Sequence, residues 1–224
     1  MKGDRMGAEK VDNPLLIVEK KATFTKALVK GPVYGEKTFT RKDGQWREWV
    51  PKRSKLCAAI RKGMRQFPFD NDSTVLYLGA ASGTTVSHVS DLCPEGMIFA
   101  VEFSPDTGRQ LMLLAKKRGN IAPIIADANQ PITYAPRVWP AEILYQDVAQ
   151  RNQVDILKRN AQMLLKQGGT AFLCCKARSI DVARNPADIF AQVRGELKGM
   201  FQILEELDLR PFTMDHRFYV MRKL

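Results

Sequence analysis

The chain is 224 residues long, 45% of its residues are hydrophobic, and its formal net charge is +11. This length is typical of one α/β domain with a small extension, and the apolar content is sufficient for a sizeable core. No apolar run approaches the ~18 residues that cross a membrane, and the first residues lack a signal-peptide pattern, so we expect a soluble intracellular protein.

The four cysteines do not predict a metal site. They are Cys57, Cys93, Cys174 and Cys175, and their spacing is neither C-x-x-C nor any other metal-binding pattern. The adjacent pair lies in an apolar run, which is typical of small buried hydrophobic residues. We therefore expect no bound metal.

The positive charge is concentrated in the N-terminal third of the chain. Residues 1–66 contain 17 Lys or Arg and 7 Asp or Glu, whereas residues 67–224 contain 18 and 17. A basic block of this kind favours contacts with phosphate groups. We expect Arg41, Lys42 and Arg47 to contact RNA, while a protein partner for the same block stays open.

Aromatic residues are interleaved with these basic ones. They are Tyr34, Phe39, Trp46 and Trp49. Exposed rings stack on RNA bases, which favours an RNA-binding surface. The same rings would equally suit the core of a small sheet.

The N-terminal third predicts a small antiparallel sheet. Strand-like runs cover residues 15–18, 22–25, 27–29 and 34–47, with turn signals at Gly31-Pro32 and Asp43-Gly44. We expect them to form a basic N-terminal domain of residues 1–52, whose first 13 residues are polar and mobile. Ser54 then caps a helix whose apolar face carries Leu56, Ala59, Ile60 and Met64.

From residue 74 onward, strands alternate with helices. The predicted strands are 74–78, 97–102, 121–127, 143–147 and 170–176. The predicted helices begin at Thr84, at Pro105, after Asn152 and at Pro186, and Gly119 and Gly168-Gly169 are expected to end the second and third. This alternation predicts a mostly parallel sheet covered on both faces, with residues 201–209 and 218–221 as an antiparallel pair at one edge.

The turn after the first of these strands carries the strongest functional signal. Strand 74–78 is followed by Gly79-Ala80-Ala81-Ser82-Gly83 and then by a helix. Glycine lets the backbone approach a ligand closely, and the free N–H groups of a helix start favour polar or anionic groups. Glu102 ends the next strand, roughly 20 residues further on, where a carboxylate can hydrogen-bond a ribose. Together they predict a nucleoside-containing cofactor.

The spacing of the small residues distinguishes two kinds of cofactor. A dinucleotide site expects G-x-G-x-x-G, and Gly79-Ala80-Ala81-Ser82-Gly83 breaks that spacing. S-adenosylmethionine contains adenosine but no phosphate, so it needs the turn and the carboxylate without the full set of glycines. The sequence favours S-adenosylmethionine; an NAD-type oxidoreductase and a turn that serves packing alone are the alternatives.

Four predicted strands end in ionisable residues. They are Glu102, Asp127, Asp147 and Lys176. The carboxyl ends of parallel strands meet at one edge of a sheet, where ligands bind. Packing does not explain four such residues, so we expect a functional site at this edge.

Several segments resemble the fibrillarin family, the RNA 2′-O-ribose methyltransferases of box C/D ribonucleoproteins. The matching segments are residues 53–56, 76–91, 100–104, 115–118, 147–150 and 176–181, of which 76–91 and 176–181 are the most specific. The resemblance runs from about Tyr34 to the C-terminus and lacks the glycine–arginine-rich tail of eukaryotic members, so it is to the archaeal form. The chain departs from the family pattern at Cys57, residues 91–96, Arg151 and Cys174-Cys175, none of which removes an expected functional side chain.

The resemblance implies the Rossmann-like fold of S-adenosylmethionine-dependent methyltransferases. This fold is a mostly parallel seven-stranded sheet whose last strand is antiparallel. It would occupy residues 53–224, and the small antiparallel β extension would occupy residues 1–52.

The resemblance also assigns ten residues to the binding of S-adenosylmethionine as the methyl donor. Gly79 belongs to the turn; Ala81, Thr84 and Thr85 would hold the methionine end; Glu102, Phe103, Asp127 and Ala128 would contact the adenosine; Asp147 and Gln150 would lie near the sulfonium. Within the adenosine group, Glu102 would bind the ribose hydroxyls and Phe103 would pack on the adenine.

A Lys-Asp-Lys-His set implied by the resemblance is matched by Lys55, Asp147, Lys176 and His216. A ribose 2′-hydroxyl must lose its proton to accept a methyl group. We hypothesise that Lys176 is the base, because partial burial and a nearby Lys55 disfavour its charged form. Asp147 would orient this lysine and the donor, and His216 would position or polarise a neighbour. The other histidine, His88, is interpreted as structural.

The partners implied by the resemblance are those of a guide ribonucleoprotein. A box C/D guide RNA would choose the nucleotide of the rRNA or tRNA substrate. The enzyme would dock on a Nop-family scaffold protein, which joins a kink-turn-binding ribosomal-type protein, in the cytoplasm of an archaeal-type cell. A non-catalytic assembly subunit with the same fold is the alternative, and the complete Lys-Asp-Lys-His set argues against it.

Overall fold

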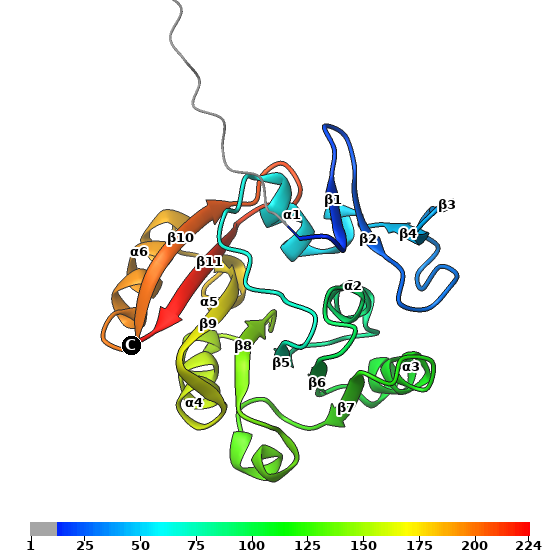
Figure 1. Ribbon diagram of the computed structural model, residues 1–224. Helices are drawn as coiled ribbons and strands as arrows, with labels where there is room; N and C mark the ends of the chain where they lie inside the picture. The colour runs from blue at the N-terminus through cyan, green and yellow to red at the C-terminus, as the bar shows by residue number, and fades with distance from the viewer. Residues whose placement is uncertain (1–12) are drawn as a thin grey trace, which may run out of the picture.

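The computed structural model describes residues 13–224, which form a large sheet flanked by helices and a smaller sheet beside it (Figure 1). The strand orders are β1-β2-β4-β3 in the small sheet and β10-β11-β9-β8-β5-β6-β7 in the large one. The expectation that residues 1–13 are mobile falls, apart from Asn13, outside the described residues. None of the helices in residues 13–224 has the length and apolarity that crossing a membrane requires.

The small sheet is antiparallel throughout, as predicted. Its strands are β1 (Leu16–Val18), β2 (Thr23–Lys26), β3 (Thr38–Arg41) and β4 (Gly44–Glu48). Arg41 pairs with Gly44, so the predicted hairpin turn lies between them. Residues 27–29 do not form the expected strand, because the N–H of Leu28 donates to Asp91 Oδ1 (2.9 Å) instead of to a neighbouring strand. The small sheet ends at Glu48, and the domain division near residue 52 stays a prediction.

A short helical segment connects the two sheets. The 3-10 helix η1 (Pro51–Arg53) leads into α1 (Lys55–Arg61). The Ser54 side chain accepts a hydrogen bond from the N–H of Cys57 (3.4 Å), which confirms the predicted cap. The apolar face of α1 is buried, and so is Met64 just beyond its end.

The large sheet has seven strands. As expected, β11 alone runs in the direction opposite to that of the other six. The strands are β5 (Thr74–Leu78), β6 (Met97–Glu102), β7 (Ile121–Ile125), β8 (Ala141–Gln146), β9 (Leu165–Lys176), β10 (Phe201–Asp208) and β11 (His216–Lys223). The helices are α2 (Thr84–Leu92), α3 (Pro105–Ala115), α4 (Gln153–Leu164), α5 (Ala177–Ile180) and α6 (Pro186–Leu197), with the 3-10 helices η2 (Pro131–Thr133) and η3 (Ala135–Arg137).

Helices cover both faces of this sheet (Figure 1). One apolar cluster includes Leu56 of α1, Val86 of α2 and Leu111 of α3. The other includes Leu157 of α4 and Ile189 of α6. Burial on both faces explains why the central strands are continuous apolar runs rather than alternating ones.

Three of the predicted element ends that differ from the structure involve a glycine or a site residue. Strand β9 begins at Leu165, and Gly168 (φ +73°) and Gly169 lie inside it at a register shift against β8, so they do not cap α4. Helix α3 ends at Ala115 rather than at Gly119, because the buried side chain of Arg118 is bound to α2. Strand β7 ends at Ile125, two residues before Asp127.

Candidate active site

A pocket of about 260 Å³ lies at the carboxyl ends of β5, β6, β7 and β8, where the sequence predicts a site. Eight of the ten predicted cofactor-binding residues line it, namely Gly79, Ala81, Glu102, Phe103, Asp127, Ala128, Asp147 and Gln150. The other two lie at the start of α2, outside this lining. Thr84 lines a second pocket, and Thr85 is buried with its hydroxyl donating to Ser54 Oγ (3.0 Å).

Glycine is required at position 79 by the close approach of two strand ends. Gly79 has φ +80°, and a Cβ added to it would clash with the carbonyl oxygen of Asp147. The Asp147 N–H donates to the carbonyl of Leu78 (3.0 Å), which holds the ends of β5 and β8 together. The turn thus brings Asp147 to the pocket wall.

The Glu102 carboxylate is fixed by three donors. Its Oε2 accepts from the N–H of Ala81 (2.7 Å), a non-glycine residue with φ +48°. Its Oε1 accepts from the N–H of Ser104 and from the Thr107 hydroxyl, both at 2.9 Å. Each carboxylate oxygen has two lone pairs, so Oε2 can accept a further hydrogen bond from a ligand hydroxyl.

Asn129 positions two of the predicted residues and was not predicted itself. Its backbone N–H and its side-chain amide both donate to Asp127 Oδ1 (2.8 and 3.0 Å). The same side-chain amide lies 3.3 Å from Gln150 Oε1, and Asn152 donates to Asn129 Oδ1 (2.7 Å). The Asp-x-Asn spacing is typical of an Asx turn, which was the available signal in the sequence.

The walls of the pocket fit an adenosine. Val101, Ala126 and Val148 supply apolar surface, and the Phe103 ring is 68% exposed beside them. A flat apolar base stacks on such a ring, while the carboxylates of Glu102 and Asp127 accept from hydroxyl and amino groups. The residues present therefore suit the adenosine part of S-adenosylmethionine.

Lys55 and Asp147 form an ion pair at the edge of this pocket. Lys55 Nζ lies 2.7 Å from Asp147 Oδ2, and about a quarter of each side chain is exposed. Burial opposes the charge on Lys55, but the Asp147 carboxylate outweighs burial, and the pKa of Lys55 is raised. Lys55 is therefore a cation at neutral pH.

His216 and Lys176 are directly opposite each other on β11 and β9. His216 Nδ1 contacts the carbonyl of Met214, which can only accept, so Nδ1 carries the proton and Nε2 keeps its lone pair when the ring is neutral. Burial, together with the charges of Lys55 and Lys176, lowers the pKa of His216 against the opposing effects of Met214 and Asp147. The ring is therefore neutral at pH 7.

The four predicted catalytic residues form two pairs, Lys55 with Asp147 and Lys176 with His216. They come from α1, the end of β8, the end of β9 and the start of β11. Asp147 belongs both to this set and to the lining of the adenosine-sized pocket.

Gln153 fixes the backbone of Lys176 and was missed from the sequence. Its Oε1 accepts from the N–H of Lys176 (3.1 Å), and its Nε2 donates to the carbonyl of Lys176 (3.2 Å). Gln153 is fully buried, so this pair of bonds is shielded from water. A single glutamine at the start of a predicted helix gives no signal of this role.

The cysteines beneath the site are not nucleophiles. Cys174 is buried, and its sulfur lies 3.0 Å from the hydroxyl of Tyr145. Burial raises the pKa of the Cys174 thiol well above its usual range, so it stays protonated.

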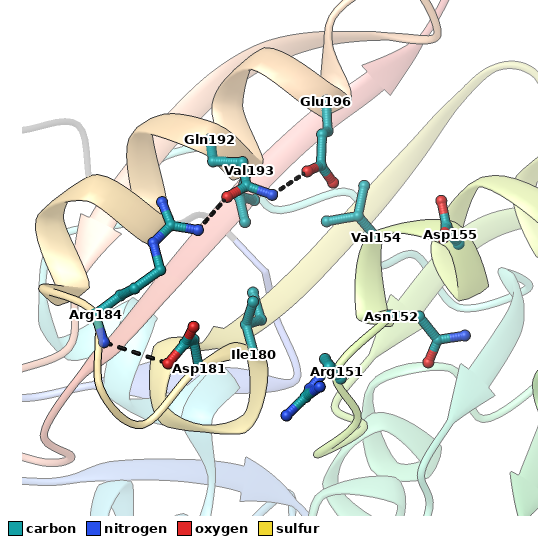
Figure 2. Close-up of a pocket in the computed structure, with 10 residues that line it drawn as sticks. All are labelled: Arg151, Asn152, Val154, Asp155, Ile180, Asp181, Arg184, Gln192, Val193 and Glu196. Carbon is teal, nitrogen blue, oxygen red and sulfur yellow. Dashed lines mark hydrogen bonds between the residues drawn. The ribbon is translucent and has the colours of Figure 1, made fainter.

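A larger pocket, of about 510 Å³, contains none of the predicted site residues. Figure 2 shows it between the start of α4 and the α5–α6 segment, with Arg184, Gln192 and Glu196 joined by hydrogen bonds along its rim. Its charged residues have mixed sign, and they include Arg151, one of the departures from the family pattern. Size alone therefore does not identify the reaction site.

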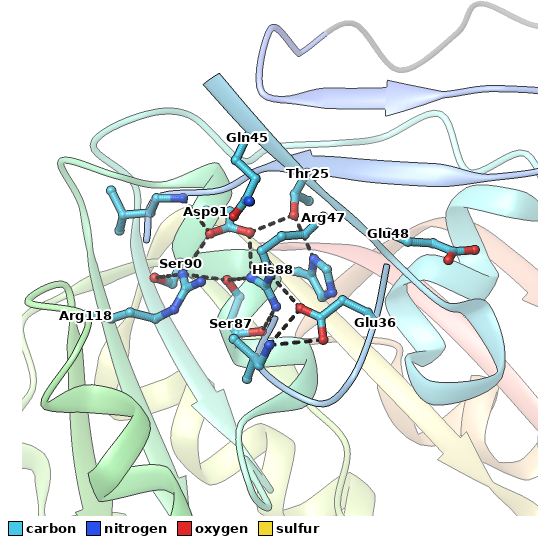
Figure 3. Close-up of polar contacts among 12 residues, drawn as sticks. Thr25, Glu36, Gln45, Arg47, Glu48, Ser87, His88, Ser90, Asp91 and Arg118 are labelled. Atoms are coloured by element: carbon cyan, nitrogen blue, oxygen red, sulfur yellow. Dashed lines mark hydrogen bonds and ion pairs between the residues drawn. The ribbon is translucent and has the colours of Figure 1, made fainter. Parts of the chain in front are cut away.

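The structure overturns part of the expected RNA surface. Arg47 is fully buried: its Nε bonds Glu36 Oε1 and its Nη1 bonds Asp91 Oδ2, both at 2.7 Å (Figure 3). Trp46 and Trp49 are buried as well, and Trp49 belongs to the apolar cluster that contains Leu56 and Val86, so neither ring is available to stack on bases. The expected contact of Arg47 with RNA is therefore wrong, whereas Arg41 and Lys42 are exposed and stay candidates.

His88 is structural, as predicted. It is fully buried and stacks on Trp49 with ring centroids 4.8 Å apart. The Thr25 hydroxyl donates to Asp91, so His88 Nδ1 must donate to Thr25 Oγ1 (2.7 Å), and Nε2 accepts from the hydroxyl of Tyr34 (2.9 Å). Both ring nitrogens are thus used within the fold.

Comparison with protein families gives one match over nearly the whole chain. The family model described as Fibrillarin matches residues 9–223. Among curated proteins, the fibrillarin-like rRNA/tRNA 2′-O-methyltransferase of Methanocaldococcus jannaschii is 45% identical over 202 residues, which cover 89% of this chain and 88% of that protein. The protein of the same name from Thermococcus gammatolerans is 47% identical over 201 residues, 89% of each chain.

Solved structures give the same result. The Methanococcus jannaschii fibrillarin pre-rRNA processing protein has a TM-score of 0.88 at 44% identity, covering 90% of this chain and 89% of that one. A fibrillarin/Nop5p complex has a TM-score of 0.88 at 43% identity, covering 94% and 98%. Aeropyrum pernix fibrillarin with natively bound S-adenosyl-L-methionine has a TM-score of 0.83 at 41% identity, covering 89% and 88%.

Proposed function

The chain belongs to the fibrillarin family, and we propose that it transfers a methyl group to a ribose 2′-hydroxyl of RNA with Lys55, Asp147, Lys176 and His216. It is an S-adenosylmethionine-dependent RNA 2′-O-methyltransferase of rRNA and tRNA. One observation carries the assignment of residues: Asp147 lines the adenosine-sized pocket and also pairs with Lys55.

The pocket residues have distinct proposed roles in holding the cofactor. Glu102 accepts hydrogen bonds from the ribose hydroxyls, and the exposed ring of Phe103 packs on the adenine. Asp127 and Ala128 contact the adenine edge, and Gln150 lies with Asp147 near the sulfonium.

Three further cofactor residues are proposed for the methionine end, and Gly79 belongs to the turn. Ala81 lines the pocket, whereas Thr84 and Thr85 begin α2. Thr85 is buried, and its hydroxyl bonds Ser54, the residue directly before Lys55.

Positioning supplies much of the acceleration in such a reaction. When bound, S-adenosylmethionine supplies a methyl group on a positively charged sulfur, which leaves as a neutral thioether when the ribose oxygen takes the methyl group. Asp147 is the carboxylate that favours the positive sulfur and holds Lys55 in place. Holding the ribose oxygen, the methyl carbon and the sulfur in line makes a bimolecular reaction effectively unimolecular.

Lys176 is the proposed base that takes the 2′-hydroxyl proton. Lys55 is unsuited to this role because its bond with Asp147 keeps it charged. Gln153 holds the backbone of Lys176 at two points, which fixes the direction in which the side chain leaves β9. The neutral His216, with an available Nε2, orients the hydroxyl or the amine by accepting a hydrogen bond.

The replacement Lys176→Ala tests the base. We expect methyl transfer to fall by roughly 10²–10⁴-fold, the usual contribution of a general base, with unchanged binding of S-adenosylmethionine. Lys198→Ala is the matched control, because Lys198 is exposed after α6 and lies outside the site. Near wild-type transfer by Lys176→Ala with donor binding retained would refute the assignment.

A Nop-family protein is the partner supported by the neighbour that was solved with Nop5p. We further propose that a box C/D guide RNA selects the substrate nucleotide and that a kink-turn-binding ribosomal-type protein completes the complex. The cytoplasmic location and the division of the chain at residue 52 stay predictions.

Methyl transfer from labelled S-adenosylmethionine to a guide-matched RNA tests this assembly. Methylation of one ribose only when scaffold and guide RNA are added would support selection by the guide. Donor binding and assembly without any methyl transfer would instead favour the non-catalytic assembly subunit.

A further inference from the structure

A second pocket, of about 420 Å³, lies between the loop of residues 29–34, the turn of residues 82–84 and helix α3. The charged residues among its lining are all cations: Lys30, Arg53, Lys117 and Arg118. No Asp or Glu is among the described residues that line it. Arg118 is paired with Asp91, and Lys30, Arg53 and Lys117 add further positive charge, so a pocket of this kind favours an anion.

Glu36 and Asp91, which bond arginines close to this pocket, are already paired within the fold. Glu36 accepts from Arg47 and from the backbone N–H groups of Val33 and Tyr34, and its side chain has no exposed surface. Asp91 is also fully buried and bonds Arg47 and Arg118. Neither carboxylate can turn toward the pocket without breaking a buried ion pair.

Arg118 lines this pocket and has a donor without a partner in the described part of the chain. The residue is 1% exposed, and its Nη1 bonds Ser87, Ser90 and Asp91. Its Nη2 is buried and has no hydrogen-bond partner among the described residues. A buried N–H group without a partner is rare and costly, which indicates that a further acceptor belongs here.

Two more features favour an anion at this position. Helix α2 begins at Thr84 after Gly83, which supplies no side-chain cap, and Thr84 lines the pocket, so the start of a helix, which favours anions, lies beside it. The Arg53 guanidinium lies over the Tyr34 ring, 5.7 Å from its centroid, which holds this cation at the rim.

We propose that this pocket binds a phosphate group in the backbone of the substrate RNA. The proposal rests on the proposed function, since it assumes RNA as the substrate. Arg53 lies two residues before Lys55, and the turn that contributes Ser82 and Thr84 also contributes Ala81 to the adenosine-sized pocket. A phosphate bound here thus belongs to the strand that carries the reacting ribose, and it fixes that strand against the catalytic lysine.

The test compares charge reversals inside and outside the pocket. Lys117→Glu and Lys30→Glu alter the lining, whereas Lys116→Glu makes the same change at the neighbouring exposed residue, which does not line the pocket. The affinity of the full-length proteins for a labelled single-stranded RNA is measured by fluorescence anisotropy over a series of NaCl concentrations. Thermal unfolding of each variant verifies that it is folded.

We expect each pocket variant to weaken RNA binding about tenfold at 0.1 M NaCl and Lys116→Glu to weaken it no more than about twofold. The slope of log affinity against log salt should also become shallower by about 0.7 for each lost phosphate contact with a single strand. In the assembled complex the KM for RNA should rise with kcat unchanged. Equal losses in Lys117→Glu and Lys116→Glu, or RNA affinity unchanged in the pocket variants, would overturn the proposal.

Two other anions are distinguished by the same variants. A loss of S-adenosylmethionine affinity without a loss of RNA affinity would identify the donor carboxylate as the ligand. Stabilisation of the wild type but not of Lys117→Glu by inorganic phosphate, with unchanged RNA affinity, would identify a site for free phosphate. Either result overturns the proposal. If the wild-type protein binds RNA and the pocket variants bind it more weakly, but the wild type transfers no methyl group, only the proposed function is refuted.

Discussion

The replacement Arg47→Met is expected to destabilise the fold, although Arg47 belongs to the basic third of the sequence. Figure 3 shows its guanidinium between the small sheet and α2. It forms ion pairs of 2.7 Å with both Glu36 and Asp91, and its Nη2 donates to Ser87 Oγ (2.9 Å). Methionine fills much of the volume of this side chain but replaces none of its hydrogen bonds.

The expected loss of unfolding free energy depends on the hydrogen bonds that the carboxylates of Glu36 and Asp91 retain. Asp91 retains its bond to Arg118, and Glu36 retains the N–H groups of Val33 and Tyr34. Removing one partner of a buried ion pair costs roughly 3–5 kcal/mol. Because the carboxylates stay partly satisfied, we expect the lower end of this range, about 3 kcal/mol of unfolding free energy.

Urea unfolding followed by circular dichroism measures this loss. Arg41→Met is the control on the same hairpin, because the Arg41 side chain is 45% exposed and its Nη2 lies 3.5 Å from Oε1 of the exposed Glu19. A surface pair of this kind is worth about 0–1 kcal/mol. If Arg47→Met lowers the unfolding free energy no more than Arg41→Met does, the buried ion pairs of Arg47 do not stabilise the contact between the small sheet and α2.

Gly79→Ala should cost roughly 1–3 kcal/mol in urea unfolding, because alanine is strained at φ +80° and its Cβ would clash with a carbonyl at the end of β8. Gly35→Ala, at φ +88° with nothing near its Cβ, is the control and should cost less. Phe103→Ala should leave stability unchanged and weaken S-adenosylmethionine binding by about 1–3 kcal/mol in calorimetry, the value of one stacked base, and the exposed Ile132→Ala should not. Burial and two nearby guanidinium groups lower the pKa of His88 well below its ordinary 6.5, so the unfolded chain binds a proton below that pH and the folded chain does not. Stability should therefore fall as pH drops from 6.5 toward 5, by up to about 1.4 kcal/mol per pH unit for this group, and urea midpoints should show a smaller fall in His88→Gln.

Elements that depend on neighbours in the sequence were predicted well. Helix α2 covers residues 84–92 and strand β6 covers residues 97–102, as expected from the apolar period and the turn residues. The position of the site was predicted for a similar reason. Glu102 ends β6 and Asp147 directly follows β8, and the carboxyl ends of parallel strands meet at one edge whatever the loops do.

Element ends that depend on distant contacts were not predicted. Gly168 and Gly169 look like a helix cap in the sequence but form part of β9, because β8 pairs with residues on both sides of them. Gln153 positions Lys176 through bonds to a residue 23 positions away, and nothing in its local sequence specifies that partner.

The sequence by itself determined the order of strands and helices, the glycine turn, and the acids and lysine at the strand ends, because each follows from local backbone preference and apolar period. Tertiary structure alone decided which basic residues are available to RNA. Arg47 and Lys117 carry the same charge, but long-range packing buries Arg47 against Glu36 and Asp91 and leaves Lys117 exposed beside a pocket without acids. Burial and pairing depend on residues far apart in the chain, and no count of local charge contains that information.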